Sequence, residues 1–208
     1  MQKPSQPICL QQKAVESWVR RQLGSVDHEK RVAEISARLF DLTWPLHGLG
    51  RPDRKLLRLA AIVHDVGRSI DDERHPQEGA RMVLDADHLP LSASERRALA
   101  YLTRHHRGKV PDAGCDRILG RTDDHERLRL TLALLRAADA LDSRAIESPR
   151  LVFALLDRRL QITCYLAANI PKARKVYARR KKFRLLEELL GCDVDLRIDL
   201  AHALLMVA

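Results

Sequence analysis

The chain has 208 residues, of which 45% are hydrophobic and only 4% aromatic, and its formal net charge is +9. This composition allows one medium-sized domain with an aliphatic core, and it excludes a fibrous or low-complexity chain. The positive charge raises the local concentration of anionic ligands, and nucleotides, polyphosphate and nucleic acid all fit that description. The scarcity of aromatic residues disfavours a stacking platform for single strands, so we do not expect nucleic acid to be a partner.

No stretch of the sequence is apolar for long enough to cross a membrane, and residues 1–7 lack the hydrophobic core of a signal peptide. We therefore expect a cytoplasmic protein with no membrane partner. The four cysteines are too scattered for a thiolate zinc site or a disulfide framework, and we expect free thiols at Cys9, Cys115, Cys164 and Cys192.

Apolar residues at helical spacing dominate the first 147 residues, and this part is predicted to be all-helical. The spacing predicts helices over about 11–23, 27–42, 53–66, 76–86, 94–106 and 124–141. Ser25 or Asp27 is predicted to cap the second helix, and Gly67 is predicted to end the third. The segment 44–52 is predicted to be a loop because it contains two prolines and two glycines.

The pattern changes near Pro149. Apolar residues and alternation predict strands over 151–156, 160–166 and 194–200, with a helix over 171–190 before the last strand. We therefore expect a mainly α protein with two parts, a helical domain at 1–147 and a small α+β appendage (strand-strand-helix-strand) at 148–208. The exposed edge of such a small sheet makes a homodimer possible.

The most informative stretch is the apolar helix that leads into His64 and Asp65. An imidazole and a carboxylate at the end of a buried helix need partners, because burying an unpaired charge is costly. A divalent metal would satisfy both groups, and hydrogen bonds to the backbone are the alternative.

Asp139 is a second polar group in an apolar setting, because the helix around it is hydrophobic on nearly every face. A buried carboxylate without a cation would shift its pKa and become neutral. The alternative is that Asp139 reaches solvent at the helix end, as we expect for Asp142. Further metal-competent groups are His28, His75 and one of His105 or His106. Imidazoles and carboxylates without thiolates suit Mn²⁺, Fe²⁺, Ni²⁺, Mg²⁺ or Zn²⁺.

The order His28, His64-Asp65, Asp139 resembles the HD superfamily of metal-dependent phosphohydrolases. The segments 64–69, 104–108 and 135–144 are similar to the C-terminal helical domain of the exopolyphosphatase/guanosine pentaphosphatase (Ppx/GppA) family, and the resemblance covers roughly 25–205. It implies an HD-type helical bundle that holds one or two metals. By resemblance, the ligands of the first metal are His28, His64, Asp65 and Asp139, and His75 and His106 help to hold a second.

That family carries ATPase-like catalytic domains ahead of this one. No glycine-rich phosphate loop precedes residue 25, so we do not carry over exopolyphosphatase activity by that mechanism. We expect instead an HD-type phosphohydrolase that acts on a nucleotide or another small phosphorylated anion. The alternative is a non-catalytic regulatory module that binds polyphosphate or a guanosine alarmone.

Four residues are expected to act in catalysis. Asp65 would bridge two metals or orient the attacking water. Arg68, Arg107 and Arg144 are expected to neutralise phosphate charge, as guanidinium groups do, and the alternative for each is a surface ion pair or a solvated side chain. The most basic run, 172–184, is predicted to be a solvated helix face, with polyphosphate binding as the alternative.

Overall fold

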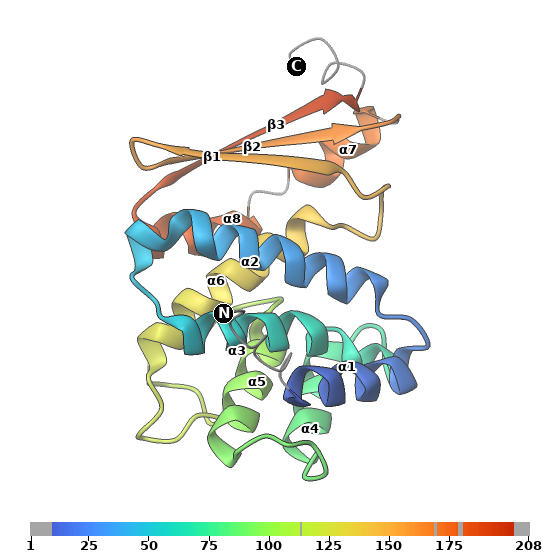
Figure 1. Ribbon diagram of the computed structural model, residues 1–208, viewed down its shortest axis with the longest axis vertical. Helices are drawn as coiled ribbons and strands as arrows, with labels where there is room; N and C mark the ends of the chain where they lie inside the picture. The colour runs from blue at the N-terminus through green and yellow to red at the C-terminus, as the bar shows by residue number, and fades with distance from the viewer. Residues whose placement is uncertain (1–9, 113, 169, 179–180, 202–208) are drawn as a thin grey trace, which may run out of the picture.

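The computed structural model describes residues 10–112, 114–168, 170–178 and 181–201. Within these ranges a bundle of helices forms one end of the molecule, and a three-stranded sheet with its flanking helices forms the other (Figure 1). The predicted mainly α fold with a small C-terminal sheet is therefore confirmed. The elements are α1 (Leu10–Leu23), α2 (Asp27–His47), α3 (Arg51–Val63), the short 3-10 helix η1 (Val66–Ser69), α4 (His75–Leu84), α5 (Ala93–His105), α6 (His125–Leu141), β1 (Arg150–Leu156), β2 (Arg159–Leu166), α7 (Ile170–Tyr177), α8 (Lys181–Leu190) and β3 (Asp193–Leu200).

Helices α3 and α6 form the centre of the bundle because both are apolar on most faces. Helix α3 buries residues 59–63, and α6 buries residues 131–141. The two helices pack against each other, and α2 packs against both. His64 follows α3 directly and Asp139 lies within α6, so the two most buried helices carry candidate ligands.

Helix α2 is longer than the sequence predicted. It continues through Trp44 and Pro45 to His47, where the prediction placed a loop. His47 accepts a backbone hydrogen bond at Nδ1, so its Nε2 carries the proton and donates to the Phe40 carbonyl at 3.0 Å. This contact holds the last turn together and offsets the hydrogen bond that Pro45 cannot donate. The helix ends at Gly48, which has a left-handed backbone with φ 62°.

The helix starts differ in how their backbone groups are satisfied. The predicted caps of α2 are wrong, because Val26 occupies the N-cap position while Ser25 and Asp27 hydrogen-bond to each other. Ser92 caps α5 in a reciprocal pair with a glutamate three residues later, and Asp124 caps α6. All three helices begin within one residue of the predicted starts, although the cap predicted for α2 is wrong.

Gly67 does not end the third helix as predicted. Helix α3 ends at Val63, and Gly67 lies in η1. A Cβ atom on Gly67 would lie 2.2 Å from the carbonyl oxygen of His75 and 2.4 Å from the nitrogen of Gly79. Glycine is required here because η1 and α4 touch through their backbones. This contact sets the start of α4 beside the end of α3.

The sheet has the order β1-β2-β3, with β2 antiparallel to β1 and parallel to β3. The hairpin between β1 and β2 turns at Asp157 and Arg158, whose φ angles are 46° and 60°. Two consecutive positive φ angles match the twist of a two-residue hairpin. The parallel pair needs a crossover connection, which α7 and α8 supply.

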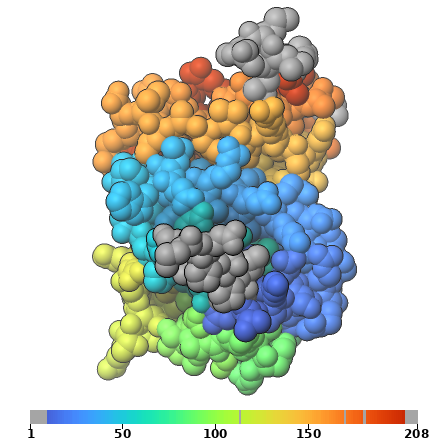
Figure 2. All heavy atoms as spheres, in the orientation of Figure 1, coloured from blue at the N-terminus to red at the C-terminus, as the bar shows by residue number. Residues whose placement is uncertain are grey.

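The single helix predicted over 171–190 is two helices, α7 and α8, separated around residues 179–180, which lie outside the described residues. Helix α7 packs against β3, whereas α8 packs mainly against α6. One straight helix could not pack on both surfaces. In the space-filling view, α2 separates the strands from the other bundle helices on the same face (Figure 2).

No helix within the described ranges has the length and apolar character needed to cross a membrane.

Candidate metal centre

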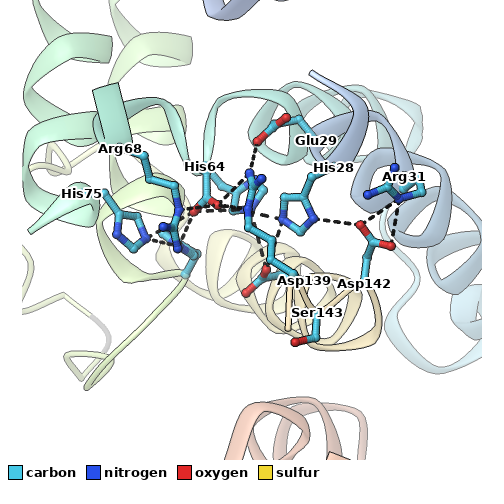
Figure 3. Close-up of polar contacts among 12 residues, drawn as sticks. His28, Glu29, Arg31, His64, Arg68, His75, Asp139, Asp142 and Ser143 are labelled. Atoms are coloured by element: carbon cyan, nitrogen blue, oxygen red, sulfur yellow. Dashed lines mark hydrogen bonds and ion pairs between the residues drawn. The ribbon is translucent and has the colours of Figure 1, made fainter. Parts of the chain in front are cut away.

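Four histidines that are far apart in the sequence meet inside the bundle. His28 lies in the first turn of α2, His64 directly follows α3, His75 begins α4, and His106 directly follows α5. None of them is more than 4% exposed. Figure 3 shows His75, His64 and His28 in a row between the helices. His75 is 0% exposed, so it is not a solvated loop residue.

The Nδ1 atom of each of these four rings faces a hydrogen-bond acceptor. For His28 the acceptor is the carboxylate of Asp142, at 2.8 Å. For the other three it is a backbone carbonyl at 2.7–2.8 Å, of Ala61 for His64, of Asp72 for His75 and of Thr103 for His106. Because these oxygens only accept, Nδ1 carries the proton and a neutral ring keeps its lone pair at Nε2. Metal-binding histidines are typically oriented in this way.

The Nε2 atoms of His28 and His64 point toward two carboxylates. They lie 3.6 Å and 3.7 Å, respectively, from Oδ1 of Asp139. Their distances to the nearer carboxylate oxygen of Asp65 are 3.9 Å and 3.6 Å. Neither Nε2 atom has a hydrogen-bond partner among the described residues. These separations are too long for direct hydrogen bonds, but they suit ligands that surround one cation.

A second group of ligand atoms shares Asp65. Its Oδ1 lies 3.2 Å from Nε2 of His75 and 3.4 Å from Nε2 of His106. The two Nε2 atoms are themselves 3.2 Å apart. When both rings are neutral, the proton on each Nδ1 leaves a lone pair on Nε2, so two lone pairs and the Asp65 carboxylate face one another. A cation between them would remove this repulsion.

Five residues therefore form two adjacent groups that could each hold a metal ion. One group contains His28, His64 and Asp65, and the other contains Asp65, His75 and His106. Asp139 adjoins the first group through its contacts with His28 and His64. The donors are imidazole nitrogens and carboxylate oxygens, which suit divalent ions such as Mn²⁺, Fe²⁺, Ni²⁺ and Zn²⁺. The orphaned Nε2 atoms and this donor chemistry both fit a metal.

Asp139 also has a partner from the C-terminal part of the chain. The ammonium group of Lys182, near the start of α8, lies 2.5 Å from Oδ2 of Asp139. Asp139 is only 8% exposed, so it does not simply reach solvent at the helix end. The run 172–184 was predicted to be a solvated face, and for Lys182 that prediction is wrong.

Two arginines converge on the outer oxygen of Asp65. Arg68 donates from Nε to Oδ2 at 2.8 Å, and Arg144 donates to the same atom at 3.2 Å. Arg144 also donates to Glu29 at 2.5 Å, and Glu29 is 1% exposed. The side chain of Arg144 is 44% exposed. The arginines therefore stand between the buried carboxylates and the solvent.

Arg107 is placed differently from the other two arginines. It is exposed and lines a cavity beside α7 and α8. The described contacts give it no ion pair with Asp65 or Asp139. Its predicted role at the same phosphate as Arg68 and Arg144 therefore has no direct geometric support.

The buried histidines and aspartates of the cluster shift one another's pKa values. Burial opposes protonation of His64, but the carboxylates of Asp65 and Asp139 outweigh it and raise the pKa of His64 to about 9. Burial lowers the pKa of His106 to about 4. Burial also acts to raise the pKa of each aspartate, but neighbouring histidines, and Lys182 in the case of Asp139, hold both well below the ordinary value. Both carboxylates are therefore anionic at neutral pH.

The alternative to His106 was its neighbour, His105. The Nε2 atom of His105 lies 2.6 Å from the carboxylate of Asp116, outside the cluster. Arg136 donates to the carbonyls of His105 and Gly108, which fixes the turn that carries His106. The structure therefore brings His106, and not His105, to the candidate metal centre.

Three residues of the centre were not predicted, namely Glu29, Asp142 and Lys182. Asp142 was expected in solvent, but it is 2% exposed and buried against His28. The available signal was its spacing of three residues from Asp139, which places both on one side of α6. Lys182 carried no signal that distinguishes it from its basic neighbours.

A family model described as Ppx/GppA phosphatase, domain III, matches residues 11–171 of the chain. The matched range contains all four histidines of the cluster together with Asp65 and Asp139. It ends at the start of α7, so Lys182 lies beyond it.

Proposed function

Because the chain belongs to the Ppx/GppA phosphatase family, through its match to domain III, we propose that it is a metal-dependent phosphohydrolase with an HD-type helical bundle. Its substrate is a nucleotide or another small phosphorylated anion. The observation that carries this proposal is the convergence of four histidine Nε2 atoms on Asp65 and Asp139. In a purely structural cluster the buried Nε2 atoms of His28 and His64 would have hydrogen-bond partners, whereas neither has one among the described residues.

The residues of the two groups divide into two sets of ligands. His28, His64, Asp65 and Asp139 would hold one divalent metal. Asp65, His75 and His106 would hold a second, with Asp65 shared. A divalent metal bound there supplies Lewis acidity and lowers the pKa of a bound water to near neutrality.

Arg68 and Arg144 bind and orient the phosphate in this proposal. Both guanidinium groups already lie at an anionic oxygen, Oδ2 of Asp65, and the exposed side of Arg144 faces the solvent from which substrate arrives. Guanidinium groups match phosphate oxygens in charge and in fork geometry. Glu29 holds Arg144 in place through the contact at 2.5 Å.

The test is hydrolysis by the purified full chain loaded in turn with Mn²⁺, Fe²⁺, Ni²⁺, Mg²⁺ and Zn²⁺. Product release is measured for each class: inorganic phosphate from phosphomonoesters, nucleotides and polyphosphates, and the nucleoside monophosphate from cyclic nucleotides. We expect release from at least one class, and we expect His64→Ala to abolish it. The matched control is His88→Ala, since His88 is an exposed histidine that contacts only the Trp18 ring in the described network. Absence of any His64-dependent release would overturn the proposal.

The non-catalytic alternative predicts a different result. A binding module would bind polyphosphate or a guanosine alarmone without hydrolysing it, and its affinity would fall steeply with salt. That binding would survive His64→Ala, because the buried ring would not contact the ligand.

A further inference from the structure

A cavity of about 660 Å³ lies between the C-terminal end of α6 and the helices α7 and α8. Cavities of about 300–1,000 Å³ are typical of small-molecule sites. The wall from α6 includes Ala140, and the opposite wall includes Val176 and Phe183. The match to the Ppx/GppA family ends at residue 171 of the chain, so most of the opposite wall lies outside the matched range.

The cavity adjoins the candidate metal centre. Lys182 lines the cavity, and its ammonium group lies 2.5 Å from Oδ2 of Asp139. Two further lining residues directly follow candidate ligands in the sequence, because Ala140 follows Asp139 and Arg107 follows His106. A molecule that reaches Asp139 from this side therefore fills the cavity with its remaining atoms.

The lining has two chemical parts. Arg107, Lys181 and Lys182 are cationic, and no acidic side chain belongs to the described lining. The remainder is predominantly apolar, and the buried hydroxyl of Tyr177 is already used by the Leu141 carbonyl at 2.9 Å. An anion with an apolar group attached matches this division, whereas a wholly inorganic anion would leave the apolar wall in contact with water.

We propose that this cavity binds the organic group of a phosphate ester while Lys182 binds the phosphate beside Asp139. The inference rests on the proposed function and narrows its substrate to organic phosphate esters, as opposed to inorganic phosphate chains. Lys182 acts as a specificity residue, because it is the cation that belongs both to the cavity and to the metal centre.

The experiment compares two phosphonates, whose carbon–phosphorus bonds cannot be hydrolysed by phosphoester chemistry. Isothermal titration calorimetry measures the affinity of phenylphosphonate and methylphosphonate for the full chain, with and without metal. We expect the phenyl compound to bind about ten-fold more tightly or better, because its ring buries apolar surface in the cavity. Equal affinities, or no binding of either compound, would overturn the inference even if the protein hydrolyses phosphate esters.

Substitutions that fill the cavity test whether the preference for phenylphosphonate arises there. Ala140→Leu from α6 and Val176→Phe from α7 each remove the preference for the phenyl compound and leave methylphosphonate affinity within about two-fold. The matched control is Val152→Phe, on the exposed face of β1. Lys182→Met weakens both compounds, because it removes charge and leaves the apolar wall intact. A preference that survives both filling variants, with folding verified by thermal melts, would place the ring elsewhere and overturn the proposal.

The two proposals fail in different ways. If the chain hydrolyses no ester but prefers phenylphosphonate, the cavity assignment stands as a binding site and the catalytic proposal fails. If hydrolysis depends on His64 but the phosphonates bind equally, the metal centre stands and the cavity assignment fails.

Discussion

The carboxylate of Asp142 lies 2.8 Å from Nδ1 of His28, across 114 residues of sequence. The same carboxylate accepts hydrogen bonds from Arg31 at 3.0 Å and from Ser148 at 2.9 Å. Asp142 thereby ties the start of α2 to the end of α6 and fixes which ring nitrogen of His28 points into the centre (Figure 3).

Asp142→Asn tests this relationship. The amide no longer holds the His28 ring through a charge-assisted hydrogen bond, so we expect metal affinity to fall by about 10–100-fold. Competition against a metal chelator measures the change. Asp123→Asn is the control, because Asp123 is paired with Arg97 far from the centre and should not alter metal affinity. Equal affinities of Asp142→Asn and the native chain would show that Asp142 does not orient a ligand.

The stoichiometry of metal binding tests the two groups separately. We expect two metals per chain, because each group offers at least three ligand atoms within reach of one cation. His106→Gln should lose one metal, and Asp65→Asn should lose both because Asp65 belongs to both groups. Mass spectrometry of the protein, purified without chelator, gives the metal content. His105→Gln is the adjacent control and should keep both metals; loss of metal there would contradict the assignment.

The pair formed by Glu29 and Arg144 tests how a buried carboxylate is stabilised. Arg144→Ala leaves Glu29 buried without its cation, and we expect the free energy of unfolding to fall by about 3 kcal/mol. Glu29→Gln in the same background should recover part of this loss, since the charge that needed a partner is gone. Urea unfolding of the two single variants and the double variant measures the coupling. Purely additive losses would show that the two side chains do not interact in solution.

Gly67→Ala tests the backbone contact between η1 and α4. The added methyl group would lie 2.2 Å from a carbonyl oxygen, so the backbone must move. We expect a loss of about 3 kcal/mol or more of stability, together with weaker metal binding because His75 shifts with α4. Gly120→Ala is the matched control, since the nearest atom to its added methyl group would lie 3.5 Å away. Similar melting temperatures for the two variants would contradict the packing described here.

The cysteines test burial directly. Burial raises the pKa of the Cys164 thiol to about 12, so this residue stays protonated and unreactive at pH 8. Cys115 is exposed, and we expect it to be alkylated within minutes under the same conditions.

Because the pKa of the Cys164 thiol in the folded state lies above its value in the unfolded state, the contribution of this thiol to the free energy of unfolding is complete below about pH 9 and is lost as pH rises toward 12. Peptide mapping after a timed pulse of iodoacetamide measures both rates, and fast labelling of Cys164 would show that the strand is not buried.

Local signals were reliable where the structure depends on neighbours in sequence. Helices α5 and α6 begin within one residue of the predicted starts, and Ser92 and Asp124 cap them, because a cap involves only the next few residues. The signals failed where a distant contact decided the outcome. Gly67 was predicted to end a helix because glycine commonly has that role, but glycine is required there by the close backbone contact with α4. The predicted helix over 171–190 is divided because its two halves pack on different partners.

For the candidate metal centre, the sequence by itself determined which residue types were available as ligands. It also determined which of them were placed in apolar surroundings, above all His64, Asp65 and Asp139. Periodicity carries this information because a buried helix is apolar around its whole circumference. Only the tertiary structure decided that Asp142 orients His28 and that Lys182 reaches Asp139. These contacts depend on how helices cross, and crossing is set by packing between segments many residues apart, which no local pattern encodes.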